Sequence, residues 1–178
     1  MENVKGKIKE ENKKIENNSQ LNILAVGANQ KNTISLYFDN KVILSPHIGD
    51  LGTLGSVEYF ERTIKTFRRL YDFNEDIIIC DKHPYYESTK WAKKQNKRVI
   101  EIQHHFAHAL SVMYEHNLDG EFLAFIFDGT GYGDDSAIWG GEVFIVNRHS
   151  YKRVHHLKYF KLIGGEKAVK NPANMAVA

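Results

Sequence analysis

The segment Ile77–Cys80, with the sequence IIIC, constrains the fold of this chain most. A short strand without any polar position is typical of a strand that is buried on both faces of a sheet. Helical patterns at residues 56–71 and 88–96 lie on either side of it, and residues 98–102 form the pattern of another strand. Strands that alternate with helices predict a sheet with helices on both faces. The sequence therefore predicts an α/β protein.

Two further strands come before this alternation and complete the predicted sheet. Residues 21–27 are apolar and end in a glycine, and Ile34–Ser45 has two apolar runs around the turn-forming pair Asp39 and Asn40. That arrangement is typical of a β-hairpin. The predicted order of elements is β-β-β-α-β-α-β-α, a mixed sheet with flanking helices. We predict Ser56 as the N-cap of the first helix.

The pattern begins again after Gly120. An apolar strand at residues 122–127 precedes the glycine-rich segment DGTGYGDDS, and two more apolar strands follow it. This order repeats that of the first lobe. We therefore predict a disordered polar arm at residues 1–20, a first α/β lobe at 21–118, and the beginning of a second, truncated lobe at 119–178.

The composition excludes several classes of protein. The 178 residues include 24 Lys and Arg and 22 Asp and Glu, and a net charge of +2 does not favour a nucleic-acid partner. Cys80 is the only cysteine, which excludes an internal disulfide and favours a reducing compartment. The chain has no apolar run long enough to span a membrane. We expect a cytoplasmic protein without membrane contacts.

Three histidines near residue 104 predict a metal site. His104 and His108 are four residues apart in a predicted helix, so their side chains share one face, whereas His105 points elsewhere. Asp128, directly after an apolar strand, is the best candidate for a third ligand. Zinc, iron and magnesium are all candidate ions, because such sites accept several metals. The alternative is a set of solvated side chains at a helix N-terminus.

Two segments could bind the phosphates of a nucleotide. Gly129, Gly131 and Gly133 would let the backbone approach a phosphate and donate N–H groups to it. In the corresponding segment of the first lobe, Lys31 could neutralise a phosphate and Asn32 could donate a hydrogen bond. The alternative for both segments is an ordinary turn.

Taken together, these motifs resemble the HypF family of carbamoyltransferases, which mature [NiFe]-hydrogenases. The resemblance rests on six segments in family order: ILAVGANQKNT, LSPHIGDL, DKHPYYEST, QHHFAHA, FDGTGYGDDSAIWGGE and NPANMAVA. They are similar to the HypF domain that resembles the tRNA threonylcarbamoyl-transfer proteins. The resemblance implies the fold of actin, Hsp70 and sugar kinases, which is ribonuclease H-like.

The resemblance also implies a chemistry. Members of this family use ATP and carbamoyl phosphate to make carbamoyl-adenylate, and pass the carbamoyl group to the C-terminal cysteine of HypE for cyanide ligand synthesis. It implies that His104 and His108 are metal ligands and that Asp128 belongs to the same metal and nucleotide site. The family's further aspartate ligand and second glycine loop are expected beyond Ala178, so this chain alone should be an incomplete enzyme.

Two other functions stay open at this point. The segments QHHFAHA and DGTGYG also resemble the tRNA threonylcarbamoyl transferases, although DKHPYYEST and SPHIGDL fit the HypF family better. A non-enzymatic fragment that binds a partner or dimerises through the edge of its second sheet is the other alternative.

Overall fold

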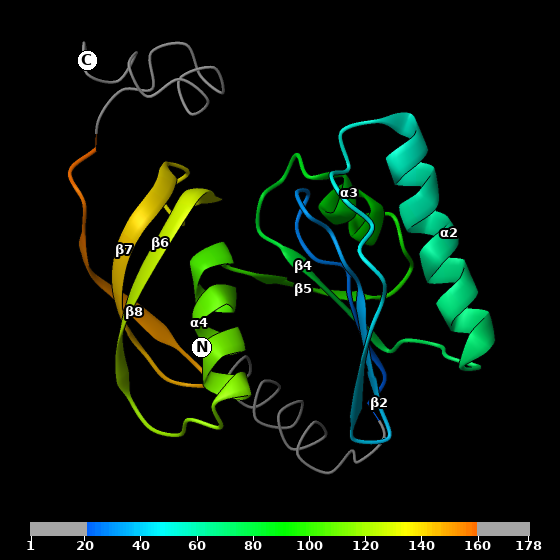
Figure 1. The fold of residues 1–178 in the computed structure, drawn as a ribbon, viewed down its shortest axis with the longest axis horizontal. Helices are drawn as coiled ribbons and strands as arrows, with labels where there is room; N and C mark the ends of the chain where they lie inside the picture. Colours follow the sequence, from blue (N-terminus) through cyan, green and yellow to red (C-terminus); the bar gives the residue numbers. More distant parts are fainter. Residues whose placement is uncertain (1–20, 160–178) are drawn as a thin grey trace, which may run out of the picture. The chain divides into compact units, whose positions relative to one another are not determined.

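The computed structural model describes residues 21–159 of the chain, and these form two compact units that divide between Ile102 and Gln103 (Figure 1). The predicted polar arm at residues 1–20 and the segment 160–178 lie outside the described residues. The described part of the chain has no helix that is long and apolar enough to cross a membrane.

The first unit contains the predicted mixed sheet. Its strand order is β3-β2-β1-β4-β5, with antiparallel pairing between β1, β2 and β3 and parallel pairing between β1, β4 and β5. The strands are β1 (Ile23–Ala25), β2 (Ser35–Phe38), β3 (Lys41–Leu44), β4 (Ile77–Asp81) and β5 (Arg98–Ile102). Asp39 and Asn40 form the predicted hairpin turn with φ angles of 48° and 57°, the left-handed conformation that such a turn requires.

Two helices cover one face of this sheet. Helix α2 (Leu54–Leu70) and helix α3 (Glu87–Lys93) contact each other through Phe60 and Trp91, whose ring centroids lie 5.6 Å apart. Both helices pack into the same core cluster as Leu24 of β1. Helices α2 and α3 therefore flank the same face of the predicted mixed sheet.

Helix α2 begins earlier than the sequence pattern predicted. Thr53 is the N-cap, and its side chain accepts a hydrogen bond from the backbone N–H of Ser56. The Ser56 hydroxyl in turn accepts one from the N–H of Thr53, which completes a capping box. The predicted N-cap Ser56 is therefore wrong by one turn, because two hydroxyl residues three positions apart satisfy the helix end together.

The second unit consists of a three-stranded sheet and the histidine-bearing helix. The antiparallel strands are ordered β6-β7-β8 and comprise β6 (Phe122–Tyr132), β7 (Ile138–Val146) and β8 (Tyr151–His156). Helix α4 (His104–Glu115) contacts β6 and β7 and buries Phe106, Ala109 and Met113. The apolar stripe of α4 thus belongs to the second compact unit. The predicted boundary between the lobes at residue 118 stays a prediction.

Strand β6 continues through the glycine-rich segment that was predicted as a turn. Its pairing with β7 shifts register between Phe127 and Gly131, which indicates a β-bulge. Asp128 therefore lies inside the strand, at the start of the irregularity, and not after the strand's end.

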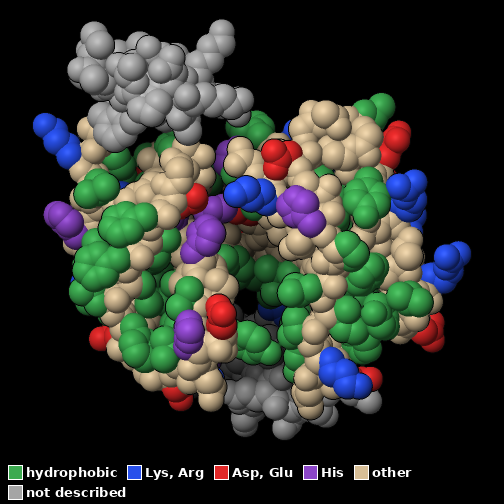
Figure 2. Space-filling model, in the orientation of Figure 1, with side chains coloured by type: hydrophobic (Ala, Val, Ile, Leu, Met, Phe, Trp, Pro, Cys, Tyr) green, Lys and Arg blue, Asp and Glu red, His purple; other side chains and the backbone are tan. Residues whose placement is uncertain are grey.

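The other face of this sheet is apolar and exposed. Leu123, Phe125 and Phe127 alternate along β6 with exposed fractions of 57%, 61% and 74%. Figure 2 shows hydrophobic side chains at the surface over this sheet. Alternation places these three residues on the face that α4 does not cover.

Candidate metal centre

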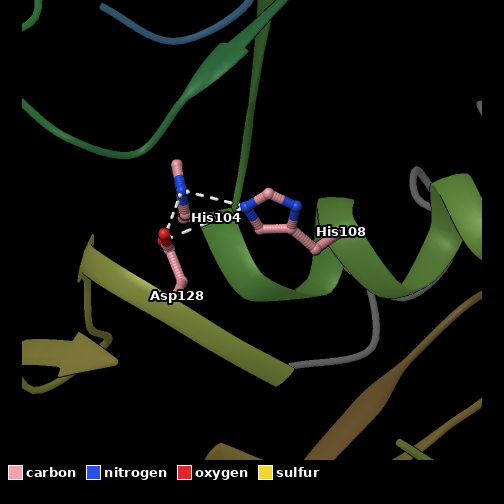
Figure 3. A group of neighbouring side chains, drawn as sticks. All are labelled: His104, His108 and Asp128. Carbon is pink, nitrogen blue, oxygen red and sulfur yellow. Dashed lines mark hydrogen bonds and ion pairs between the residues drawn. The ribbon is translucent and has the colours of Figure 1, made fainter. Parts of the chain in front are cut away.

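The N-terminus of α4 brings two of the predicted ligands together. Gln103 is the N-cap and accepts a hydrogen bond from the N–H of Phe106, so the helix begins directly at His104. The Nε2 atoms of His104 and His108 lie 3.3 Å apart, as the four-residue spacing predicted (Figure 3). The two rings therefore present their nitrogen atoms to one point.

Asp128 of β6 approaches the same point. Its Oδ2 lies 3.0 Å from Nε2 of His104 and 3.9 Å from Nε2 of His108 (Figure 3). Its Oδ1 accepts a hydrogen bond of 2.7 Å from the N–H of Gly129, which fixes the orientation of the carboxylate. Asp128, which was predicted as a ligand because it follows an apolar run, thus lies beside two histidines that are about twenty positions earlier in the chain.

These three atoms have a spacing that suits a divalent cation. A triangle with their three separations has a circumscribed circle of radius about 2.0 Å, close to the bonds that zinc makes to imidazole nitrogen and carboxylate oxygen. One point can therefore lie at bonding distance from all three atoms. Two neutral imidazoles and one carboxylate are also an ordinary donor set for zinc or iron.

The carboxyl group of Asp128 is held in its charged form. The hydrogen bond from His104 is the largest cause, and it lowers the pKa of Asp128 from 3.8 to about 2, against the opposing effect of burial. A carboxylate that stays ionised well below neutral pH is ready to bind a cation without first losing a proton.

His105 lies in the interior of the second unit, and its Nε2 lies 3.9 Å from Oδ2 of Asp128, so this side chain borders the site that His104 and His108 form. Its side chain is fully buried, and its ring lies near Trp139 and Phe144, with centroid distances of 6.0 and 6.5 Å. Burial is the main cause that lowers the pKa of His105, so this imidazole is neutral at neutral pH.

The glycines of DGTGYGDD differ in what surrounds them. A Cβ at Gly131 would lie 2.3 Å from Cε1 of His105, and one at Gly133 would lie 2.2 Å from Nε1 of Trp139. Gly129 has nothing within 4 Å of that position. Close packing against two rings therefore explains Gly131 and Gly133 without a phosphate. Nucleotide binding by these glycines stays a prediction.

Gly140 makes the corresponding close approach from β7. A Cβ there would lie 2.9 Å from the carbonyl oxygen of Asp128. The pair of glycines in WGGE predicts a β-bulge or a close packing site, and the contact at Gly140 is such a close approach.

Lys31 and Asn32 lie in the first unit, in the segment that follows β1. Asn32 is buried, and its amide nitrogen donates to the carbonyl oxygens of Val26 and Ala28 at 2.8 and 2.5 Å. This amide stabilises its own turn, so it has a structural role. The backbone N–H of Lys31 donates to Asp50. A nucleotide contact by Lys31 or Asn32 stays a prediction.

The geometry defines an α/β protein with a candidate His-His-Asp metal site at the junction of a helix and a bulged strand. The family model described as the HypF Kae1-like domain matches residues 18–115, more than half of the chain. The model for the second subdomain of the carbamoyltransferase Kae1-like domain matches residues 124–178. The chain therefore belongs to the HypF Kae1-like domain family.

Curated relatives support this membership. The chain is 39% identical over 161 residues to carbamoyltransferase HypF of Synechocystis, covering 90% of this chain and 21% of that protein. It is 35% identical over 170 residues to the probable carbamoyltransferase HypF of Methanocaldococcus jannaschii, covering 93% and 22% of the two chains. The chain thus spans about a fifth of the length of these relatives.

Solved structures confirm the fold. A full-length HypF in the phosphate- and nucleotide-bound form matches with a TM-score of 0.80 and 39% identity, covering 83% of this chain and 20% of that one. HypF of T. kodakarensis matches with a TM-score of 0.77 and 37% identity, over 86% and 21% of the two chains. The predicted actin-like, ribonuclease H-like fold is therefore confirmed.

Proposed function

We propose that this chain contributes part of the carbamoyl-transfer site of a HypF-type enzyme. The reaction would pass the carbamoyl group of carbamoyl-adenylate, made from ATP and carbamoyl phosphate, to the C-terminal cysteine of a HypE-like acceptor protein. Cyanide ligands of [NiFe]-hydrogenase would then derive from that group. The observation that carries this proposal is the convergence of His104, His108 and Asp128 in a chain of the HypF family.

In this proposal the three side chains hold a divalent cation. His104 and His108 offer imidazole nitrogen atoms, and Asp128 offers a carboxylate that its neighbours keep ionised. When bound, such an ion would polarise phosphate or carbamoyl oxygens and stabilise the charge of the adenylate leaving group. The phosphate- and nucleotide-bound state of the solved HypF relative supports the use of a nucleotide.

In this proposal the nucleophile of the transfer comes from the acceptor protein. Cys80 is the only thiol of this chain, it is buried, and burial raises its pKa to about 11. A thiol in that state is protonated and inaccessible at neutral pH. This is consistent with a separate HypE-like partner, and the single reduced cysteine fits action in the cytoplasm.

Metal binding by the purified chain tests the site directly. We expect about one Zn²⁺ or Co²⁺ per chain by calorimetric titration, and loss of binding when His104 and His108 are both replaced by Ala. His116→Ala is the matched control, because it removes an exposed histidine from the end of the same helix. Equal metal binding by the double variant would contradict the proposed ligands.

The reaction itself separates the three candidate functions. The chain, alone and within a full-length HypF relative whose matching domain it replaces, is assayed with ATP, carbamoyl phosphate and a HypE-like acceptor. We expect carbamoylation of the acceptor cysteine, detected by mass spectrometry, in the full-length context. Modification of tRNA instead would favour the threonylcarbamoyl transferase, and no transfer in either context would favour a non-catalytic partner-binding fragment.

A further inference from the structure

His105 lies between the two elements that supply the metal ligands. It is the second residue of α4, next to His104, and its ring packs directly on the backbone of Gly131 in β6. Any side chain at position 131 would overlap this ring and also the ring of His104, whose Cδ2 would be 2.9 Å from a Cβ. The contact between His105 and Gly131 therefore sets how closely α4 approaches β6.

The hydrogen bonds of Gln103 determine which nitrogen of His105 carries the proton. The Oε1 of Gln103 accepts from the N–H of Phe106 at 2.8 Å, and its Nε2 donates to the carbonyl oxygen of Tyr132 at 3.1 Å. Neither contact is possible if the amide is turned around. The same Nε2 has a second hydrogen, and it lies 3.4 Å from Nδ1 of His105.

It follows that Nδ1 of His105 is an acceptor and that Nε2 carries the proton of the neutral ring. This Nε2 is buried and has no hydrogen-bond partner among the described residues. Oδ2 of Asp128 lies 3.9 Å from it. That distance is too long for a hydrogen bond, but in a buried setting an N–H group this close to a carboxylate attracts it electrostatically.

We propose that His105 is a positioning residue for the metal site: its Nε2–H holds the carboxylate of Asp128 toward His104 and His108, and its ring fixes the approach of β6 to α4. The inference rests on the proposed metal site. Groups that orient a ligating carboxylate commonly change metal affinity 10- to 100-fold, roughly, when they are removed.

Two substitutions separate the N–H group from the ring. His105→Phe keeps a ring of similar size and removes the donor, whereas His105→Gln keeps an amide donor near the position of Nε2. We expect His105→Phe to weaken Co²⁺ binding by roughly 10- to 100-fold and to change the visible absorption of the bound ion. His105→Gln should recover part of that loss. His116→Phe on the exposed end of α4 is the control.

Wild-type affinity and an unchanged Co²⁺ spectrum in a folded His105→Phe chain would overturn the inference. If that variant does not fold, the same comparison is made with His105→Gln, for which an affinity at least 100-fold below wild type would contradict a role for the donor.

A measurement without metal keeps this inference distinct from the proposed function. Nitrogen-15 NMR of the imidazoles should show His105 protonated at Nε2, with a shift of that nitrogen in Asp128→Asn. A proton on Nδ1, or no response to Asp128→Asn, would overturn the inference even if the wild-type chain binds metal. If the wild-type chain binds no metal while the NMR result holds, the metal function fails and the contact between His105 and Asp128 stands.

Discussion

At residue 131 the absence of a side chain allows the histidines of α4 to lie against β6. The ring of His105 occupies the space that a Cβ would need. Neither neighbour can move freely, because His105 is fully buried and Gly131 lies within a paired strand. The glycine-rich segment therefore has a packing role that its sequence alone, which resembles a phosphate-binding loop, does not reveal.

Gly131→Ala should consequently destabilise the chain and weaken its metal site. We expect a loss of about 1–3 kcal/mol in the free energy of unfolding, as for other overpacked cores, and a weaker affinity for Zn²⁺. Urea unfolding and competition with a chelator measure the two effects. Gly129→Ala is the matched control, because a Cβ there meets nothing within 4 Å. Equal effects of the two substitutions would contradict this packing role.

Asp128 should make the stability of the chain depend on pH in acid. Its pKa falls from 3.8 in the unfolded chain to about 2 in the folded one. Because the pKa is lower in the folded chain, the charged carboxylate stabilises the fold fully at pH values above the pKa of the unfolded chain. This stabilisation is lost as the pH falls through the pKa of the folded chain. The Asp128 side chain is only 25% exposed, so solvent screens this effect little. We expect the carboxylate to contribute about 2 kcal/mol to the free energy of unfolding.

Asp128→Asn should therefore flatten the pH dependence of the unfolding free energy between about pH 5 and pH 2. Urea unfolding of both chains in metal-free buffer, at a series of pH values, measures the difference. Parallel curves for the wild type and the variant over this range would show that Asp128 is not stabilised as a carboxylate in the folded chain.

At the scale of elements, periodicity in the sequence was enough to predict most of the described strands and helices. The hairpin around Asp39 and Asn40 and the pairing of His104 with His108 follow from local rules of spacing. The course of β6 does not, because a strand that continues through three glycines depends on its pairing with β7 and on the rings packed against it. The position of Asp128 beside α4 is likewise a tertiary contact between distant segments.

The capping box at the start of α2 can be tested by substitution. Thr53→Ala removes one half of the capping box and should lower the free energy of unfolding by about 1 kcal/mol. Thr66→Ala, at an exposed position near the C-terminal end of the same helix, is the control and should be neutral or slightly stabilising, because Ala is the better helix former. Chemical unfolding followed by circular dichroism measures both. A larger loss at Thr66 than at Thr53 would contradict the observed cap.

For the molecule as a whole, the apolar face of the second sheet matters most for association with another surface. Leu123, Phe125 and Phe127 point away from α4, and β-pairing places Val143 and Ile145 of β7 on the same face. Three exposed apolar residues of β6 thus lie beside two half-buried ones of β7. Contiguous apolar surface of this kind is typical of a surface that binds another surface.

We therefore predict that the isolated chain associates with itself through this face, in a manner that depends on concentration. Phe125→Lys places a charge at the centre of the face and should shift the chain toward monomer, with little effect on folding because the side chain is already 61% exposed. Sedimentation velocity at several concentrations measures the shift. Tyr114→Lys, which replaces a side chain that is 78% exposed on α4, is the control. A wild-type chain that stays monomeric, or an equal effect of Tyr114→Lys, would show that the apolar face of β6 and β7 does not drive association.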